Sequence, residues 1–160
     1  MSEKSPYSPP SADLTVSAAP EDIETLRKNL IPKWIKFFGW IFIVFGVLAP
    51  IAGVMSIIFG VEGEFALYGL NGFGSVLSPI ALTVLVLFAA HGICAYGLLF
   101  AKQWGVISCL ILGYISIAIC LLTMLVGDEL NIRIELLVLI PYLMTLHKIK
   151  KQWLGGDENI

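Results

Sequence analysis

Few residues in this sequence combine a reactive side chain with a position where its chemistry has a use. His91 lies deep inside an apolar segment, eleven residues before Lys102, and Cys94 follows it by three residues. Imidazole is the side chain that most readily exchanges a proton near neutral pH. An ionisable group inside a membrane costs free energy and is often functional. His91 is therefore a candidate functional residue, with a hydrogen-bonded packing role as the alternative.

Glu135 is a second candidate, because it lies near the start of the last apolar segment. A helix over 130–147 is about 27 Å long at 1.5 Å per residue, so a span here has to include Glu135. The carboxylate should then point into the protein rather than at lipid. Arg133 is also a candidate, although it can extend outward to the membrane surface. Glu135 has two interpretations: it makes a structural hydrogen bond, or it belongs to a cation or partner site shared with Glu62, Glu64 or Asp128.

Patterns typical of catalysis or metal binding are missing from the sequence. Cys94 and Cys109 are placed symmetrically about the joint at 101–104 and can approach each other, but no Cys-x-x-Cys pair occurs. No Gly-x-Ser-x-Gly or His-Glu-x-x-His motif is present, and the glycine-rich joint at 60–75 lacks the Gly-Lys-Ser/Thr of a phosphate loop. We expect no catalytic residue, no cofactor and no metal.

The segments that carry these residues are apolar enough for a membrane. Hydrophobic residues make up 58% of the chain and charged residues 14%, whereas soluble domains have about 25% charged residues. The apolar residues form four blocks, at about 34–59, 76–100, 105–126 and 130–147. A transmembrane helix needs about 20 residues, so the first three blocks qualify and the fourth is marginal.

Charged residues predict how these spans are oriented. Nine of the ten basic residues flank the blocks on one side: Lys4, Arg27, Lys28, Lys33, Lys36, Lys102, Lys148, Lys150 and Lys151. The positive-inside rule places both termini in the cytoplasm. Juxtamembrane lysines are typical of contact with anionic lipid, so we expect the lipid bilayer and no nucleic acid as a partner. A bacterial inner membrane is the expected location, without a cleavable signal.

The four spans form a transmembrane domain at 33–154. Three further segments lie outside this domain. Residues 1–19 are rich in Ser, Pro and Ala and are predicted to be a disordered tail, and 155–160 a second tail. Residues 20–32 carry Ile23, Leu26 and Leu30 at helical spacing, which predicts a short interfacial amphipathic helix that anchors on the membrane surface.

The joint at 60–75 is the longest segment on the outer side. Phe65, Tyr68 and Phe73 alternate there with glycines, a composition that favours a loop seated at the membrane interface. Connecting segments of this length often carry function. These three aromatic residues are therefore candidate partner-binding residues.

Small residues mark two helix faces. Gly39, Gly46, Gly53 and Gly60 recur every seven residues, and a second stripe contains Cys109, Gly113, Ser116, Cys120, Thr123 and Gly127. Small residues let membrane helices approach closely, and a seven-residue repeat favours left-handed crossing. We predict an all-α integral membrane protein, built as a compact left-handed four-transmembrane-helix bundle with a short interfacial N-terminal helix. A substrate path along these faces is the alternative interpretation.

These observations favour a non-enzymatic membrane protein that acts through protein-protein interaction, as an accessory subunit or a protector of another membrane protein or of a second copy. A small homo-oligomeric transporter or channel is the alternative, and a lipid-acting enzyme is least favoured. A water-filled cavity that connects His91 and Glu135 would favour transport. The layout resembles that of small four-span bacterial membrane proteins, and no motif indicates a particular family.

Overall fold

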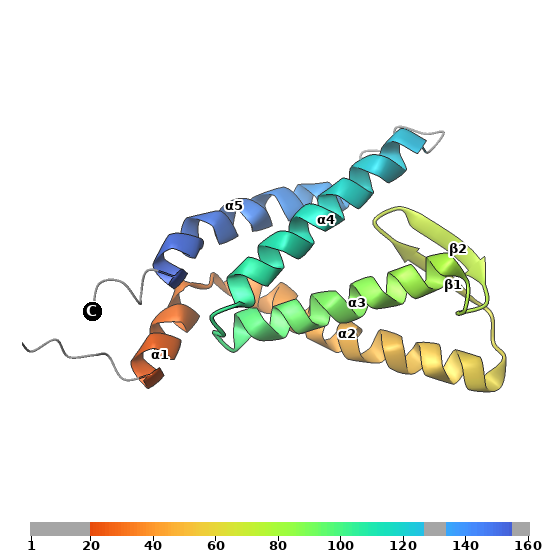
Figure 1. Ribbon diagram of the computed structural model, residues 1–160, viewed down its shortest axis with the longest axis horizontal. Coiled ribbons are helices and arrows are strands. Elements are labelled where there is room, and N and C mark those ends of the chain that lie inside the picture. The colour runs from red at the N-terminus through yellow and green to blue at the C-terminus, as the bar shows by residue number, and fades with distance from the viewer. Residues whose placement is uncertain (1–19, 127–133, 155–160) are drawn as a thin grey trace, which may run out of the picture.

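The computed structural model describes residues 20–126 and 134–154. Within these ranges the chain is mainly helical, with one β-hairpin between the second and third helices (Figure 1). The elements in chain order are α1 (Pro20–Leu30), α2 (Lys33–Phe59), β1 (Gly63–Leu67), β2 (Leu70–Gly74), α3 (Pro79–Leu99), α4 (Gly105–Val126) and α5 (Ile134–Leu154). The predicted tails at 1–19 and 155–160 lie outside the described residues.

Three of the described helices, α2, α3 and α4, are long and apolar enough to cross a membrane. They correspond to the expected blocks at 34–59, 76–100 and 105–126, so these three predictions of long apolar helices are confirmed. The fourth block is only partly described, because its first four residues fall in 127–133. Helix α5 runs from Ile134 past His147 to Leu154 and carries lysines in its last two turns. A fourth span therefore stays a prediction.

Each long helix packs mainly on its neighbour in the chain: α2 on α3, α3 on α4, and α4 on α5. In Figure 1 the pair α2 and α3 and the pair α4 and α5 diverge from the short joint between α3 and α4. The hairpin lies on the open side between the two pairs, where β1 and β2 both contact α3. This arrangement leaves space between the pairs, which the site described below occupies.

Glycines set the contact between α2 and α3. A Cβ built on Gly46 would lie 2.6 Å from the Cα of Gly92, so the two backbones touch and leave no room for a side chain. Membrane helices gain their packing contacts from such close approach, since lipid gives them no hydrophobic reason to associate. The facing residues along this interface are Gly39 with Leu99, Gly46 with Gly92, and Gly53 with Leu85. Both helices therefore contribute residues at intervals of seven.

Gly60, the last glycine of the predicted stripe, has a different role. It ends α2 in the left-handed conformation, with φ of 62°, and a Cβ placed on it would meet no atom within 4 Å. Glycine is favoured at this position because it adopts positive φ without steric cost. The hydroxyl of Ser56 donates to the carbonyl of Val61 beside this cap. The prediction that Gly60 packs against another helix is wrong.

The small-residue stripe of α4 faces the protein interior. Ser116 and Cys120 have no exposed surface. Gly113 lies against α5, where a Cβ would come within 2.6 Å of a methyl group of Leu143. Gly127 of the predicted stripe lies outside the described residues.

Helix α1 docks against the end of α5. Arg27 is 9% exposed, and its Nε donates to the carbonyl of Trp153 at 3.2 Å. Trp153 is fully buried, and its indole N–H donates to the carbonyls of Lys102 and Gln103 in the α3–α4 joint. The Lys102 ammonium lies 3.5 Å from the carboxylate of Glu24. One face of α1 therefore contacts protein, a role that the surface-anchor interpretation did not include.

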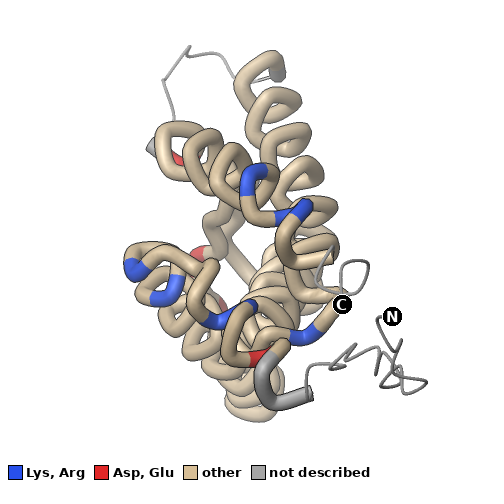
Figure 2. Tube along the Cα trace, turned by 90° about the vertical axis from the view of Figure 1, so that its left-hand side faces the viewer, with Lys and Arg blue, Asp and Glu red and all other residues tan. Residues whose placement is uncertain are grey.

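The basic residues gather at this same end of the molecule. The described Lys and Arg residues lie in α1, the first turns of α2, the α3–α4 joint and the last turns of α5 (Figure 2). Glu62, Glu64 and Glu135 belong to the other end, in the segment before β1, in β1 and in the first turn of α5. The molecule is therefore electrically asymmetric along its helices.

Candidate functional site

The hairpin presents one side chain to the helices. Leu67 pairs with Leu70, so Tyr68 and Gly69 form a two-residue turn with φ of 51° and 80°. Positive φ at both positions is typical of a type I′ turn, whose twist matches that of the strands. Tyrosine rarely adopts this conformation, so surrounding contacts must hold it. One of them is the hydroxyl of Thr123 on α4, which donates to the carbonyl of Tyr68 at 2.8 Å.

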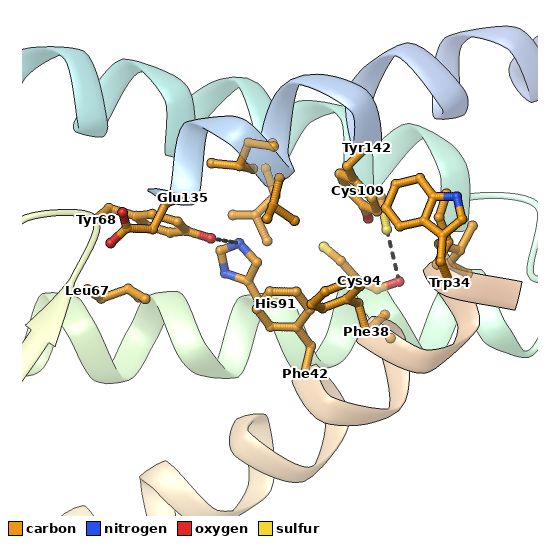
Figure 3. Close-up of a pocket in the computed structure, with 18 of the residues that line it drawn as sticks. Trp34, Phe38, Phe42, Leu67, Tyr68, His91, Cys94, Cys109, Glu135 and Tyr142 are labelled. Carbon is orange, nitrogen blue, oxygen red and sulfur yellow. Dashed lines mark hydrogen bonds between the residues drawn. The ribbon is translucent and has the colours of Figure 1, made fainter. Parts of the chain in front are cut away.

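The side chain of Tyr68 reaches into the middle of α3. It is 4% exposed, and its hydroxyl lies 2.8 Å from Nε2 of His91 (Figure 3). His91 also stacks on the ring of Phe42 from α2, with ring centroids 5.1 Å apart. The imidazole is thus held by the hairpin on one side and by α2 on another.

The hydrogen bonds of His91 indicate one tautomer. Its Nδ1 lies 2.7 Å from the carbonyl oxygen of Leu87. A carbonyl only accepts, so Nδ1 carries a proton and donates it there. In the neutral ring Nε2 is then an acceptor, which the Tyr68 hydroxyl satisfies. Ser116, 3.3 Å from Nε2, directs its own hydroxyl proton to the carbonyl of Leu112 at 2.9 Å.

A cavity of about 690 Å³ lies beside this pair, between the four long helices and the hairpin. One wall consists of aromatic side chains at intervals of four on α2, namely Trp34, Phe38 and Phe42. Tyr142 of α5 faces them, 6.5 Å from Trp34 between ring centroids. Most of the remaining lining is apolar, so the cavity suits the apolar part of a ligand.

Polar groups line the cavity near the hairpin. Tyr68, Asn71 and His91 take part in the lining there, together with Glu135 from the first turn of α5. Figure 3 shows the Glu135 carboxylate beside the Tyr68 ring. Glu135 itself is exposed, so its carboxylate retains solvent contact at the edge of the cavity.

Burial changes the acidity of the turn tyrosine. It raises the pKa of Tyr68 from 10.0 to about 12, because the phenolate would lose its hydration. The neighbouring carboxylate of Glu135 acts in the same direction, since two negative charges repel. Tyr68 is therefore a hydroxyl donor at neutral pH.

Cys94 and Cys109 line another part of the cavity, and the Cys109 thiol lies 3.3 Å from the Cys94 carbonyl. Neither forms a disulfide, and Cys120 does not form one either. Their proximity follows from the symmetric positions about the α3–α4 joint. Within the described residues, no group of three His, Cys, Asp or Glu side chains is placed to hold a metal ion.

The candidate functional residues predicted from the sequence lie in different parts of the molecule. Tyr68, His91 and Glu135 meet at the cavity. Glu62 lines a separate small hollow of about 220 Å³ beside the end of α2. Arg133 lies outside the described residues.

The other hairpin residues lie on its two faces. Glu64 and Phe73 are cross-strand partners on the outer face, and the Phe73 side chain is 77% exposed. Phe65 is partly buried on the opposite face, where its partner Gly72 lies against Ile80 of α3.

Tyr114 is not a partner of His91, although the two residues are about equally far along the sequence from the α3–α4 joint. It is on the exposed side of α4, and its hydroxyl bonds to Nε2 of His147 on α5. A straight comparison of depth along two antiparallel helices ignores which way each side chain points. The hairpin supplies the hydroxyl instead.

Sequence reasoning did not identify the aromatic wall. Trp34, Phe38 and Phe42 were visible as an i, i+4, i+8 stripe, which places all three rings on one helix face. Tyr142 and Asn71 had no such signal, because only the tertiary arrangement brings them to the cavity. Comparison of the chain with known protein families, with curated proteins and with solved structures gives no match.

Proposed function

We propose that the chain is an integral membrane protein whose four long helices form a left-handed bundle, widened on the hairpin side. The seven-residue intervals on both α2 and α3 support left-handed crossing, since faces that repeat every seven residues stay in contact when the two helices wind around each other in the left-handed sense. The basic end would lie in the cytoplasm of a bacterial cell, with α5 as the fourth span. Tryptophans beside the basic residues, such as Trp34 and Trp104, are typical of a membrane interface.

Within this bundle, the proposed function is to bind a small amphiphilic molecule and to carry it as the substrate of a small transporter, without catalysis. The observation that carries this proposal is that His91 and Glu135 line one cavity of about 690 Å³. Small-molecule sites commonly measure about 300–1,000 Å³ and combine apolar walls with a few placed polar groups. The cavity lies within a single chain, so binding would not require a second copy.

Binding can be tested with the purified protein in lipid nanodiscs. The probes are three aromatic compounds of similar shape: tetraphenylphosphonium, tetraphenylborate and neutral triphenylphosphine oxide. Equilibrium dialysis against empty nanodiscs isolates the saturable part of binding. We expect saturable binding of at least one probe, because each has an apolar body that fits the aromatic wall.

A matched pair of variants locates the site. Val138 lines the cavity and is 37% exposed, so Val138→Trp can fill the space without disturbing the core. Leu137, the next residue, is 75% exposed and is not part of the lining. We expect Val138→Trp to abolish saturable binding and Leu137→Trp to preserve it. Absence of saturable binding for all three probes, or equal binding by both variants, would contradict the proposal.

A protein partner is the second candidate function, and the exposed outer face of the hairpin favours it. Phe73 projects a large apolar ring from this face, beside the carboxylate of Glu64. Purification in mild detergent would recover a partner that Phe73→Ala loses. Leu122→Ala, which truncates a 61% exposed side chain on α4, should retain that partner.

A further inference from the structure

The charge balance of the cavity narrows the class of ligand, an inference that rests on the proposed binding function. Among the described residues that line it, Glu135 supplies a carboxylate, and none is a lysine or arginine. The described basic residues are grouped around α1 and the α3–α4 joint, and none of them lines the cavity. A ligand with a negative head would find no counter-charge among these side chains.

His91 does not alter this balance in the tautomer that its contacts indicate. Its Nδ1 proton is committed to Leu87, and its Nε2 accepts from Tyr68. The neutral ring adds no positive charge, and no N–H of the imidazole is left to bind an anion. The Tyr68 hydroxyl is likewise committed to His91, so the polar groups beside Glu135 do not form an anion-binding set.

Aromatic rings supply the second feature that a cation requires. Trp34, Phe38, Phe42, Tyr68 and Tyr142 all line the cavity. The face of an aromatic ring carries negative electrostatic potential, and it attracts a cation placed within about 6 Å of the ring centroid. This attraction grows when water is excluded, as between membrane helices. Trp34 and Tyr142 stand nearly perpendicular, at 74°, so they offer two differently oriented surfaces.

We infer that the cavity binds an amphiphilic organic cation, with its apolar body along the aromatic wall of α2 and its charge between that wall and Glu135. A carboxylate at the edge of an aromatic cavity selects positive charge, while the apolar walls exclude small hydrated ions. Both parts of the site come from helices on opposite sides of the cavity. A bound cation would therefore bridge α2 and α5.

The three probes described above test this inference, because tetraphenylphosphonium and tetraphenylborate have the same shape and opposite charge. In nanodiscs of zwitterionic lipid we expect the phosphonium to bind about tenfold more tightly than the borate, or better. Glu135→Gln should weaken phosphonium binding by about tenfold and leave binding of the neutral oxide unchanged. Glu64→Gln is the control, since it removes an exposed carboxylate that does not line the cavity.

The possible outcomes separate this inference from the proposed function. Equal binding of all three probes, with Glu135→Gln inert and Val138→Trp still blocking, would overturn the cation inference and leave the amphiphile site intact. Preference for the borate would overturn it as well. Loss of all saturable binding from the wild type would overturn both. Thermal unfolding of Glu135→Gln in the same nanodiscs establishes that any loss of binding comes from the site and not from the fold.

Discussion

The hydroxyl of Tyr68, at the tip of a hairpin, lies 2.8 Å from Nε2 of His91 in the middle of α3. This contact joins a segment outside the long helices to a histidine that lies among them. It also explains how the chain accommodates an imidazole in an apolar environment, since both ring nitrogens have a hydrogen-bond partner. The same tyrosine and histidine form part of the cavity wall.

Removing the Tyr68 hydroxyl should destabilise the protein. Tyr68→Phe leaves Nε2 of a partly buried imidazole without its donor, and an unsatisfied buried polar group costs about 1–3 kcal/mol. The chain contains a matched control in Tyr114, which bonds to His147 at an exposed position. Tyr114→Phe should therefore change stability by less than about 0.5 kcal/mol. Thermal unfolding in detergent compares the two variants, and equal losses would contradict this role of Tyr68.

The raised pKa of Tyr68 predicts a loss of stability in alkali. The folded protein keeps the phenol protonated up to about pH 12, whereas the unfolded chain releases the proton above pH 10.0. The stabilisation from this group is therefore complete below pH 10 and is lost as the pH rises towards 12. The loss is on the order of 2 kcal/mol, at 1.36 kcal/mol for each pKa unit.

Lysines also titrate between pH 10 and pH 12. The quantity to measure is therefore the gap in unfolding free energy between the wild type and Tyr68→Phe. Because the variant has no phenol to ionise, the gap should narrow from pH 10 to pH 12. A gap that stays constant or widens over this range would show that Tyr68 ionises in the folded protein as it does in the unfolded chain.

Gly46 should tolerate no side chain. In most helices Gly→Ala is stabilising by about 0.5–1 kcal/mol. Here the added methyl would lie 2.6 Å from the backbone of Gly92, which cannot move aside as a side chain can. We expect Gly46→Ala to destabilise by about 1–3 kcal/mol.

Gly39→Ala is the control on the same helix face. Its added methyl would meet the flexible end of Leu99 at 3.2 Å. We expect a smaller loss than at Gly46, measured as the difference in Tm in one detergent. The reverse order would show that α2 and α3 do not meet at Gly46 and Gly92.

The contact between Arg27 and Trp153 should hold α1 against α5. Arg27→Gln removes the guanidinium that bonds to the Trp153 carbonyl and lies over its ring. We expect faster hydrogen exchange in the amides of α1, with little change in α3 and α4. Lys28→Gln changes the adjacent, exposed charge, which is 3.7 Å from Glu24, and should have a minor effect because exposed ion pairs contribute little. Unchanged exchange in Arg27→Gln would contradict this role.

The helical part of this fold was predictable because hydrophobic runs and small-residue spacing act locally along one helix. The block boundaries at 34–59 and 105–126 agree closely with α2 and α4. Gly46 was visible as a packing residue since a seven-residue interval repeats one face. Gly60 followed the same interval but ends the helix, and spacing alone does not distinguish a contact from a cap.

The hairpin was less predictable, and the site depends on it. Its glycines suggested an irregular loop, whereas Tyr68–Gly69 is a two-residue turn flanked by paired strands. A tyrosine with positive φ is unusual, so propensity argues against a turn at this position. The contacts of Tyr68 with His91 and Thr123 stabilise the turn, and these contacts join residues far apart in the chain.

The tautomer of His91 decides whether the Tyr68 hydroxyl donates to a neutral imidazole in the cavity wall. The measurement is the ¹⁵N chemical shift of the two imidazole nitrogens at neutral pH in nanodiscs, with His147→Gln used to assign the signals. We expect a neutral ring with the proton on Nδ1 and an unprotonated Nε2, whose chemical shift changes in Tyr68→Phe. A neutral ring protonated on Nε2 would contradict the donor and acceptor roles assigned to the Tyr68 and Leu87 hydrogen bonds, and an imidazolium would contradict the charge balance of the cavity.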